Sequence, residues 1–276
     1  MEPPILSIDV RQLGQEGVIC ALLVGDVLID CGPASRVQTL LEGLGERRPR
    51  VLALTHIHLD HAGAAGTLAA LWPDLEIWVH ERGAPHLVDP SRLLASATRL
   101  YGEDMDRLWG EVRAVPEQNL RVLSGGEELD GFEVAYTPGH ASHHVSYWHR
   151  ETRTAFVGDV GGVRAAAGTH VLAPTPPPDI DVELWQESIE TIRRWRPRDL
   201  AITHFGVFSD AASHLDAAER SLEANSARAR EQGAEEWIAQ TLGELDPADE
   251  IFKLAAPLDQ CYAGLERYWS KREVTR

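Results

Sequence analysis

The stretch THIHLDHAG, residues 55–63, places three histidines and one aspartate within six consecutive positions of a chain that has only 12 histidines among 276 residues. It follows the apolar segment VLALT at 51–55, which is typical of a buried strand, and it precedes a helical pattern over 63–72. The polar cluster therefore lies where a strand ends and the chain turns into a helix. Side chains at such strand ends collect at a sheet edge, where α/β proteins commonly place functional sites.

The spacing within this stretch separates its side chains into two sets. Residues two apart in extended backbone face the same side, so His56 and His58 converge on one point while Ile57 turns toward the core. Asp60 and His61 fall at the turn into the helix and face a second point nearby. Imidazole is the commonest metal ligand and carboxylate balances the charge of the ion, so the pattern predicts binding of Zn, Fe or Mn.

Three further polar residues follow apolar strands and can complete such a site. His140 comes after a Pro-Gly turn in TPGHASHH, Asp159 follows an apolar strand in FVGDVGG, and His204 ends another strand in AITHFG. Each is expected at a sheet edge, like the cluster at 56–61, and we include all three among the candidate ligands. Asp30, at the end of a strand in LIDCG, either orients a ligand histidine or caps its strand.

The remaining pattern indicates two groups of strands, each followed by helices. A hairpin is predicted by VICALLV and VLIDC on either side of Gly25-Asp26, which is a two-residue turn signal. Further strands are expected at 51–55, 75–80, 132–137, 145–149, 154–159 and 199–206, and helices at 34–48, 63–72 and 184–195. Two groups of strands with helices outside favour two facing sheets in a layered α/β architecture.

Two helical regions lie outside this alternation. Residues 82–115 are predicted to form a helical insertion between strands, and residues 210–276 a C-terminal helical extension. We expect residues 1–209 to form the catalytic domain and both helical regions to cover its site or to form a dimer interface. Several large side chains are candidates for an apolar pocket wall, with packing inside a helical layer as the alternative: Tyr101, Met105, Trp109, Trp185 and Tyr262.

The composition restricts the partners of the protein. A formal net charge of −17 repels nucleic acid and anionic lipid at long range, but it leaves room for a small molecule at a locally cationic site. The longest apolar runs, such as 18–24, are far shorter than the ~20 residues of a membrane helix, and the N-terminus carries no signal-peptide pattern. We expect a cytoplasmic protein with a small-molecule substrate, no nucleic-acid or membrane partner, and homodimer formation as an open alternative.

The three cysteines, Cys20, Cys31 and Cys261, are too few for a disulfide framework and lack the spacing of a metal motif. In the predicted hairpin Val24 opposes Val27, which places Cys20 opposite Cys31. We expect buried free thiols, and the sequence leaves open whether the first two ever pair.

Taken together, HIHLDH (56–61), His140, Asp159 and His204 resemble, in order, the ligand motifs of the metallo-β-lactamase fold superfamily of hydrolases. The resemblance covers about residues 5–209 and leaves the subfamily open between glyoxalase II-like and lactonase-like branches. It implies an α/β (α+β) fold, a four-layer αβ/βα sandwich with two divalent metal ions per chain at one edge, zinc being favoured over iron or manganese. Carried over by position, the first ion takes His56, His58 and His140, the second takes Asp60, His61 and His204, and Asp159 bridges them.

The resemblance also implies a reaction. A metal-bridging hydroxide attacks a small ester, thioester or lactone-like substrate, and Asp60 ligates and orients or accepts a proton. Arg164 and His170, in the loop after the bridging aspartate, and His144 are candidate substrate contacts, with a solvent-facing or packed position as the alternative. That loop departs from the glyoxalase II pattern and lacks the matching tyrosine of acyl-homoserine lactonases. The alternatives are a sulfur dioxygenase-like oxidoreductase with one iron, a phosphodiesterase, and a non-catalytic metal-binding protein.

Overall fold

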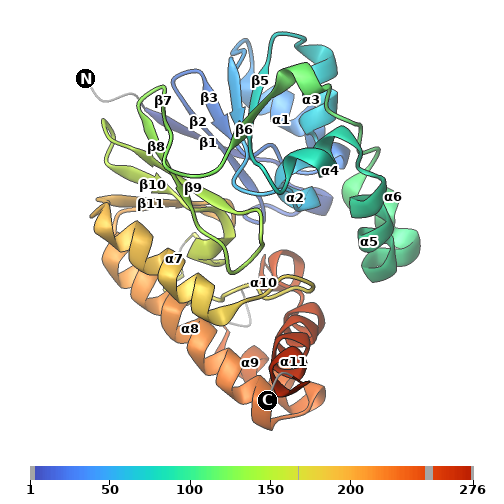
Figure 1. Cartoon of the computed structure of the whole chain (residues 1–276), viewed down its shortest axis with the longest axis vertical. Helices are drawn as coiled ribbons and strands as arrows, with labels where there is room; N and C mark the ends of the chain where they lie inside the picture. The colour runs from blue at the N-terminus through green and yellow to red at the C-terminus, as the bar shows by residue number, and fades with distance from the viewer. Residues whose placement is uncertain (1–3, 167, 246–250, 275–276) are drawn as a thin grey trace.

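In the computed structural model, which describes residues 4–166, 168–245 and 251–274, two six-stranded sheets face each other and helices cover their outer faces (Figure 1). The first sheet has the order β1-β2-β3-β4-β5-β6 and contains Ile5–Asp9, Cys20–Val24, Val27–Ile29, Val51–Ala53, Glu76–His80 and Leu120–Leu123. The second has the order β12-β11-β10-β9-β8-β7. Numbered from β7 to β12, its strands are Glu128–Leu129, Phe132–Tyr136, Val145–His149, Thr154–Phe156, Asp199–Ile202 and Gly206–Phe208. The predicted four-layer sandwich is confirmed.

The apolar run in β2 shows how the layers follow from the sequence. Successive side chains of a strand point to opposite faces, so Leu22 and Val24 enter the core between the sheets while Ala21 and Leu23 face the helices. A strand covered on both faces needs no polar alternation, which is why this segment is continuously apolar. The centre of the core between the sheets is aromatic and includes Trp78, Phe132 and Tyr147.

Helices with one apolar stripe complete the outer layers. On the first sheet, α1 (Val37–Leu44) buries Leu40 and α3 (Ala65–Leu71) buries Leu68 in the same cluster. On the second sheet, α7 (Val182–Arg194) and α8 (Ala211–Glu231) pack their apolar sides against β10 and β11 (Figure 1). Apolar residues three and four apart on a helix make such a stripe, and its burial holds the layers together.

The hairpin at Gly25-Asp26 forms as predicted, with Val24 opposite Val27. The expected position of Cys20 opposite Cys31 is wrong, because β3 ends at Ile29 and Asp30 turns the chain with a left-handed φ of 54°. The Cys20 side chain then lies in the core between the sheets, whereas Cys31 lies in the cluster under the helices. Both are buried free cysteines.

Helices also form in the two regions expected outside the sandwich. Between β5 and β6 lie α4 (Ala84–Val88), α5 (Ser91–Tyr101) and α6 (Met105–Trp109). After α8 come α9 (Ala234–Glu244), α10 (Ile251–Ala255) and α11 (Leu258–Val274), and Figure 1 shows α10 and α11 below α2 (Leu59–Ala62). The Tyr101 hydroxyl donates a hydrogen bond of 3.2 Å to Gln260 Oε1, which joins the insertion to α11. Within the described part of the chain, no helix is long and apolar enough to cross a membrane.

Candidate metal centre

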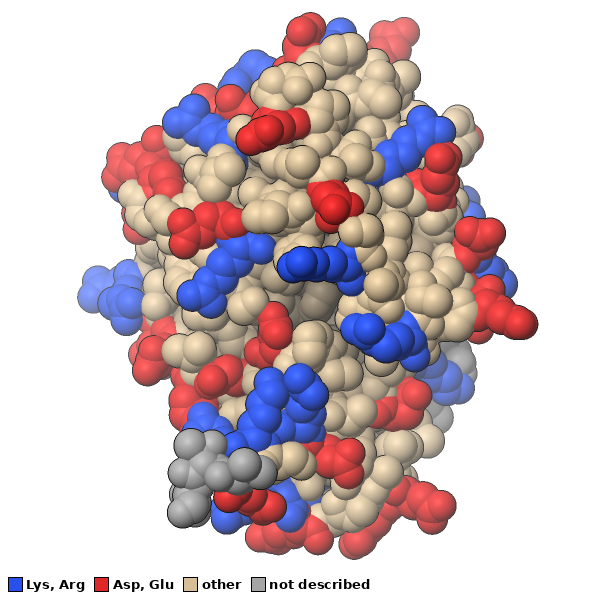
Figure 2. Space-filling model, turned by 45° about the vertical axis from the view of Figure 1, so that its right-hand side comes forward, with Lys and Arg blue, Asp and Glu red and all other residues tan. Residues whose placement is uncertain are grey.

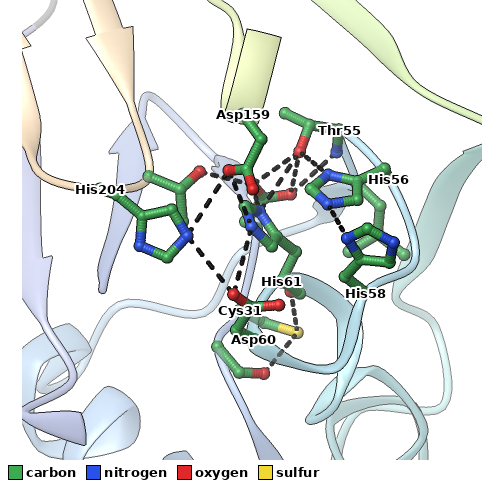
Figure 3. Close-up of polar contacts among 12 residues, drawn as sticks. Cys31, Thr55, His56, His58, Asp60, His61, Asp159 and His204 are labelled. Carbon is green, nitrogen blue, oxygen red and sulfur yellow. Dashed lines mark hydrogen bonds and ion pairs between the residues drawn. The ribbon is translucent and has the colours of Figure 1, made fainter. Parts of the chain in front are cut away.

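All seven candidate ligands lie together at one edge of the sandwich, on segments that follow β4, β8, β10 and β11. They form two groups in which the potential donor atoms lie within 4.8 Å of one another: His56, His58, His140 and Asp159, and Asp60, His61 and His204. Figure 3 shows Asp60, Asp159 and His204 converging around His61. These groups match the two sets that the sequence resemblance implies.

In the first group, three imidazole rings bring their nitrogens to one point. His56 Nε2 and His140 Nε2 each lie 3.0 Å from His58 Nδ1. The other nitrogen of His140, Nδ1, lies 2.9 Å from the Pro174 carbonyl oxygen, so it carries the proton and leaves Nε2 with a free lone pair. Burial lowers the pKa of His56 and His140 and lowers that of His58 to about 4. All three rings are therefore neutral, the form that binds a metal.

Asp159, a member of the first group, lies between the two groups. Its Oδ1 lies 3.1 Å from His61 Nε2 and 3.5 Å from His204 Nε2, while its Oδ2 lies 3.3 Å from His140 Nε2. Asp60 Oδ2 lies 3.4 Å from His204 Nε2 and 3.8 Å from His61 Nε2. The two oxygens of Asp159 thus face different groups, which is the arrangement that a bridging carboxylate requires.

Asp60, Asp159 and the neighbouring histidines shift one another's pKa values. Burial raises the pKa of Asp60, but His61 and His204 outweigh it and lower the pKa to about 2. The pKa of Asp159 is held well below its usual value in the same way. Burial lowers the pKa of His61, but Asp159, Asp60 and Asp30 outweigh it and raise that pKa well above the ordinary histidine value. The carboxylates therefore stabilise a positive charge at His61, and a metal cation bound there would supply that positive charge instead.

Asp30 contacts the candidate ligand His61, in line with one of the two roles that the sequence left open for it. Its fully buried carboxylate lies 2.7 Å from His61 Nδ1 and accepts hydrogen bonds from Thr55 N and from Thr203 Oγ1, both at 2.8 Å. Asp30 therefore holds a proton of His61 at Nδ1, so Nε2 is the nitrogen that faces Asp60 and Asp159 and that would bind an ion once its own proton is displaced. On the opposite side, His204 Nδ1 lies 2.7 Å from the Val18 carbonyl oxygen, which likewise directs Nε2 inward.

Three buried atoms at the centre fit a bound metal. His61 Nε2, His204 Nε2 and Asp159 Oδ1 form no hydrogen bond with any residue that the structure describes. Although His61 Nε2 and Asp159 Oδ1 are 3.1 Å apart, their orientation does not meet hydrogen-bond geometry. Buried polar atoms without a partner are costly and rare, so converging unpartnered donors are the signature expected of an ion site.

The predicted substrate contacts lie elsewhere. Arg164 is 8% exposed, and its guanidinium is held by Asp210 at 2.9 Å and stacks over Phe208. His170 packs edge-on against Phe252, and His144 is fully buried with Nδ1 2.9 Å from Thr137 Oγ1. None of these three is among the described residues that line the cavity over the centre. Their placement therefore gives no support to a role in binding a substrate there.

That cavity has a volume of about 530 Å³, and its floor includes His58, Asp60, Asp159 and His204. Of the five proposed wall residues, Tyr101 and Trp109 line it, and Met105 packs beside them. Trp185 and Tyr262 lie instead in the core of the second sheet and its helices, as the alternative interpretation expected.

Sequence reasoning missed several residues that support or line the site. Thr55 and Thr203 look like ordinary strand residues, but both donate their hydroxyls to Asp30. The only signal in the sequence is that a threonine precedes His56 and His204 alike. Arg82, also not singled out in the sequence, lines the cavity from the beginning of the insertion.

The segment before α7 connects the first group to the C-terminal helices. The Pro174 carbonyl oxygen that orients His140 is followed by Thr175, whose hydroxyl donates to the Cys261 carbonyl oxygen at 2.9 Å. On the next turn of α11, a Cβ added to Gly264 would lie 1.9 Å from the Thr175 carbonyl oxygen. Only glycine permits this close approach, so α11 packs directly on the segment that holds a candidate ligand.

The sequence and the fold of this chain are similar to those of known proteins. The sequence profile of the Metallo-beta-lactamase superfamily matches residues 18–204, which include all seven candidate ligands. The metallo-beta-lactamase fold-containing protein ST1585 of Sulfurisphaera tokodaii is 28% identical over 192 residues, 66% of this chain and 69% of its own. Its crystal structure aligns with 95% of this chain and 98% of that chain at a TM-score of 0.72 and 22% identity.

Two further relatives carry information on activity or metal. The hydroxyacylglutathione hydrolase GloC of Haemophilus influenzae is 30% identical over 155 residues, 52% of this chain and 68% of its own. The crystal structure of TTHA1623 in a di-iron-bound form aligns with 74% of this chain and 93% of that chain, at 25% identity and a TM-score of 0.54. Because the profile spans more than half of the sequence, the chain belongs to the metallo-beta-lactamase superfamily.

Proposed function

We propose that the protein is a hydrolase that binds two divalent metal ions and acts on a small ester, thioester or lactone. The observation that carries the proposal is the pair of donor groups beneath the cavity, with Asp159 facing both and unpartnered buried atoms at their centre. Imidazole and carboxylate donors suit zinc, iron and manganese. We favour zinc, and the di-iron form of TTHA1623 keeps iron as the alternative.

Two ions bound at these residues supply Lewis acidity and a hydroxide nucleophile at neutral pH. The protein holds the donors in place: Asp30 fixes the tautomer of His61, and the Val18 carbonyl fixes that of His204. Asp60 lines the cavity with a side chain that is 21% exposed, so it is the carboxylate of the second group that a substrate can approach. Its pKa of about 2 makes it a weak base, which suits ligation and orientation of the nucleophile better than uptake of a proton.

The test is activity of a preparation whose metal content is known. Protein loaded with zinc, iron or manganese is expected to hold about two ions per chain by elemental analysis, and to hydrolyse members of a panel of esters, thioesters, lactones and phosphodiesters. Asp60→Ala is expected to lose that activity. Asp74→Ala, which changes an exposed carboxylate that pairs with Arg48, is the matched control.

Two outcomes would contradict the proposal. In the first, the metal-loaded wild-type protein reacts no faster than Asp60→Ala with any substrate of the panel. The protein would then bind metal without being a hydrolase. A single bound iron, with oxygen uptake on addition of a persulfide, would instead identify a sulfur dioxygenase-like oxidoreductase.

A further inference from the structure

The cavity over the candidate metal centre has walls that are mainly apolar. The insertion contributes Leu93, Ala97, Leu100, Tyr101 and Trp109, and α10 contributes Leu254 from the other side. A volume of about 530 Å³ lies within the range of ligand pockets that enclose most of a small molecule. The walls therefore fit a substrate with a substantial apolar part next to the bond that reacts.

The mouth of the cavity exposes apolar surface from both sides. Leu100 on α5 is 43% exposed and Leu254 on α10 is 37% exposed, and both line the cavity. Single exposed leucines are ordinary on protein surfaces, but two that share the rim of one apolar cavity extend its binding surface outward. The hydrogen bond from Tyr101 to Gln260 fixes the spacing between the insertion and α11.

The charged residues of the same cavity are unevenly distributed. Four exposed cationic side chains line it, in a protein whose net charge is −17: Arg82, Arg92, Arg107 and Lys253. Arg107 pairs with the exposed Asp104 at 2.9 Å, so the excess rests mainly on the others. Apart from the candidate ligands Asp60 and Asp159, the described lining includes one carboxylate, Asp179, which accepts a hydrogen bond from Ser142 Oγ at 2.6 Å. Figure 2 shows Lys and Arg side chains around a hollow near the middle of the face it presents. Such a local excess of positive charge attracts an anion and raises its local concentration.

We propose that the substrate is an anionic acyl ester or thioester, whose apolar acyl chain lies between α5 and α10 and whose negative charge lies among the cationic residues of the rim. This inference rests on the proposed hydrolase function and specifies its substrate class. A nucleic-acid phosphodiester uses the same cations but leaves the apolar walls without a partner, and the remaining surface repels it. A short neutral ester uses neither feature.

The test uses two matched series of substrates, in which acetic, butyric, hexanoic or octanoic acid is esterified to the phenol oxygen. The phenol is para-hydroxybenzoate in the benzoate series and para-hydroxybenzamide in the benzamide series. The two alcohol parts have nearly the same shape but differ in charge; because they also differ as leaving groups, each rate is divided by that of the same ester with hydroxide. The acyl part differs only in its length. For the benzoate series, kcat/KM is expected to rise about fourfold for each methylene that enters the cavity, until the cavity is filled. The benzoate esters are expected to react faster than the benzamide esters at low ionic strength, and added salt is expected to reduce this difference.

Substitutions at the rim separate the two parts of the inference. Leu100→Ser and Leu254→Ser are expected to flatten the dependence on chain length. Leu242→Ser is the matched control, because Leu242 is 49% exposed on α9 and lies outside the cavity lining. Arg82→Gln is expected to reduce the preference for the benzoate esters by about two- to fivefold, the range typical of exposed ion pairs. Arg48→Gln, at an exposed pair with Asp74, is its control.

Each outcome decides something different. Equal rates for all chain lengths and both charges would overturn this inference and leave the hydrolase function standing. If the metal-loaded protein hydrolyses none of these esters or the wider panel, the hydrolase function fails. Binding of the non-hydrolysable octyl ether of para-hydroxybenzoate, measured by titration calorimetry, then decides the ligand class. Binding that weakens in Leu100→Ser but not in Leu242→Ser supports the cavity as a site for anionic amphiphiles, and no binding overturns it.

Discussion

Replacement of Asp30 by asparagine tests how the candidate metal centre is oriented. Asparagine has the same shape as aspartate and tolerates the left-handed φ of 54° at this position. It offers one acceptor oxygen and an amide nitrogen with two donors, whereas the carboxylate offers two acceptors. If the amide oxygen keeps the bond to Thr55 N, the amide nitrogen takes the place of Oδ2, which now lies 2.7 Å from His61 Nδ1.

The expected consequence is a change in the tautomer of His61. Its Nδ1 must then accept a hydrogen bond, so the ring keeps a proton on Nε2, the atom that would otherwise bind the ion. Loss of such an outer partner typically costs about 10- to 100-fold in metal affinity, or about 1.4–2.7 kcal/mol. Stabilisation by a ligand in excess falls by the same free energy, so the rise in Tm on metal addition is expected to shrink by about 3–10 °C.

The assay is a zinc titration against a chromophoric chelator, together with thermal unfolding at saturating zinc. Asp30→Asn is expected to weaken one of two binding steps and to leave the other close to wild type. Asp9→Asn is the matched control, because the Asp9 carboxylate also accepts hydrogen bonds through both oxygens, from Arg11 N and Gly17 N at 2.8 Å, outside the candidate metal centre. Wild-type affinity for both ions in Asp30→Asn would refute the reasoning, since the orientation of His61 would then not depend on the carboxylate.

Three further predictions concern stability. Removal of metal by a chelator is expected to lower Tm by several degrees, because the converging buried donors lose their common partner; an unchanged Tm in calorimetry would argue against a resident ion. Gly264→Ala is expected to destabilise the protein by about 1–3 kcal/mol through the clash with Thr175. Gly243→Ala, in open space on α9, is expected to stabilise it by about 0.5–1 kcal/mol. Similar denaturation midpoints for the two variants would contradict the packing of α11. Burial lowers the pKa of His214 from 6.5 to about 4, so its contribution to stability is complete above pH 6.5 and is lost as pH falls toward 4, by roughly 3 kcal/mol. In urea denaturation with chelator present, the difference in free energy of unfolding between wild type and His214→Gln is expected to narrow by that amount from pH 6.5 to pH 4. A difference that does not change with pH would exclude this role of His214.

The grouping of the seven candidate ligands could be predicted from the sequence because its signals are local. Each candidate ligand directly follows an apolar strand or a turn, and parallel strands deliver such positions to one edge. The substrate contacts could not be predicted in this way. Arg164 follows Asp159 closely, but its conformation is set by Asp210, which lies 46 residues further along the chain. No local pattern contains that pairing.

The strand ends were harder to predict for a related reason. The hydrophobic pattern continues through VLIDC, which made the hairpin look long enough to place Cys20 opposite Cys31. The strand stops at Ile29 because Asp30 turns out of the sheet to reach His61 and Thr203, and both partners are distant in sequence. The short strand β6, Leu120–Leu123, was missed because Arg121 and Val122 are both exposed and give no alternation.

The contact between α11 and the Pro174–Thr175 segment has a thermodynamic consequence. His140 takes its orientation from a carbonyl oxygen whose neighbouring residue is bonded to Cys261. If docking of α11 strengthens metal binding by some factor, metal must strengthen docking by the same factor, because the two free energies belong to one cycle. The resistance of the C-terminal helices to proteolysis would then report the occupancy of the candidate metal centre, which lies in another part of the chain.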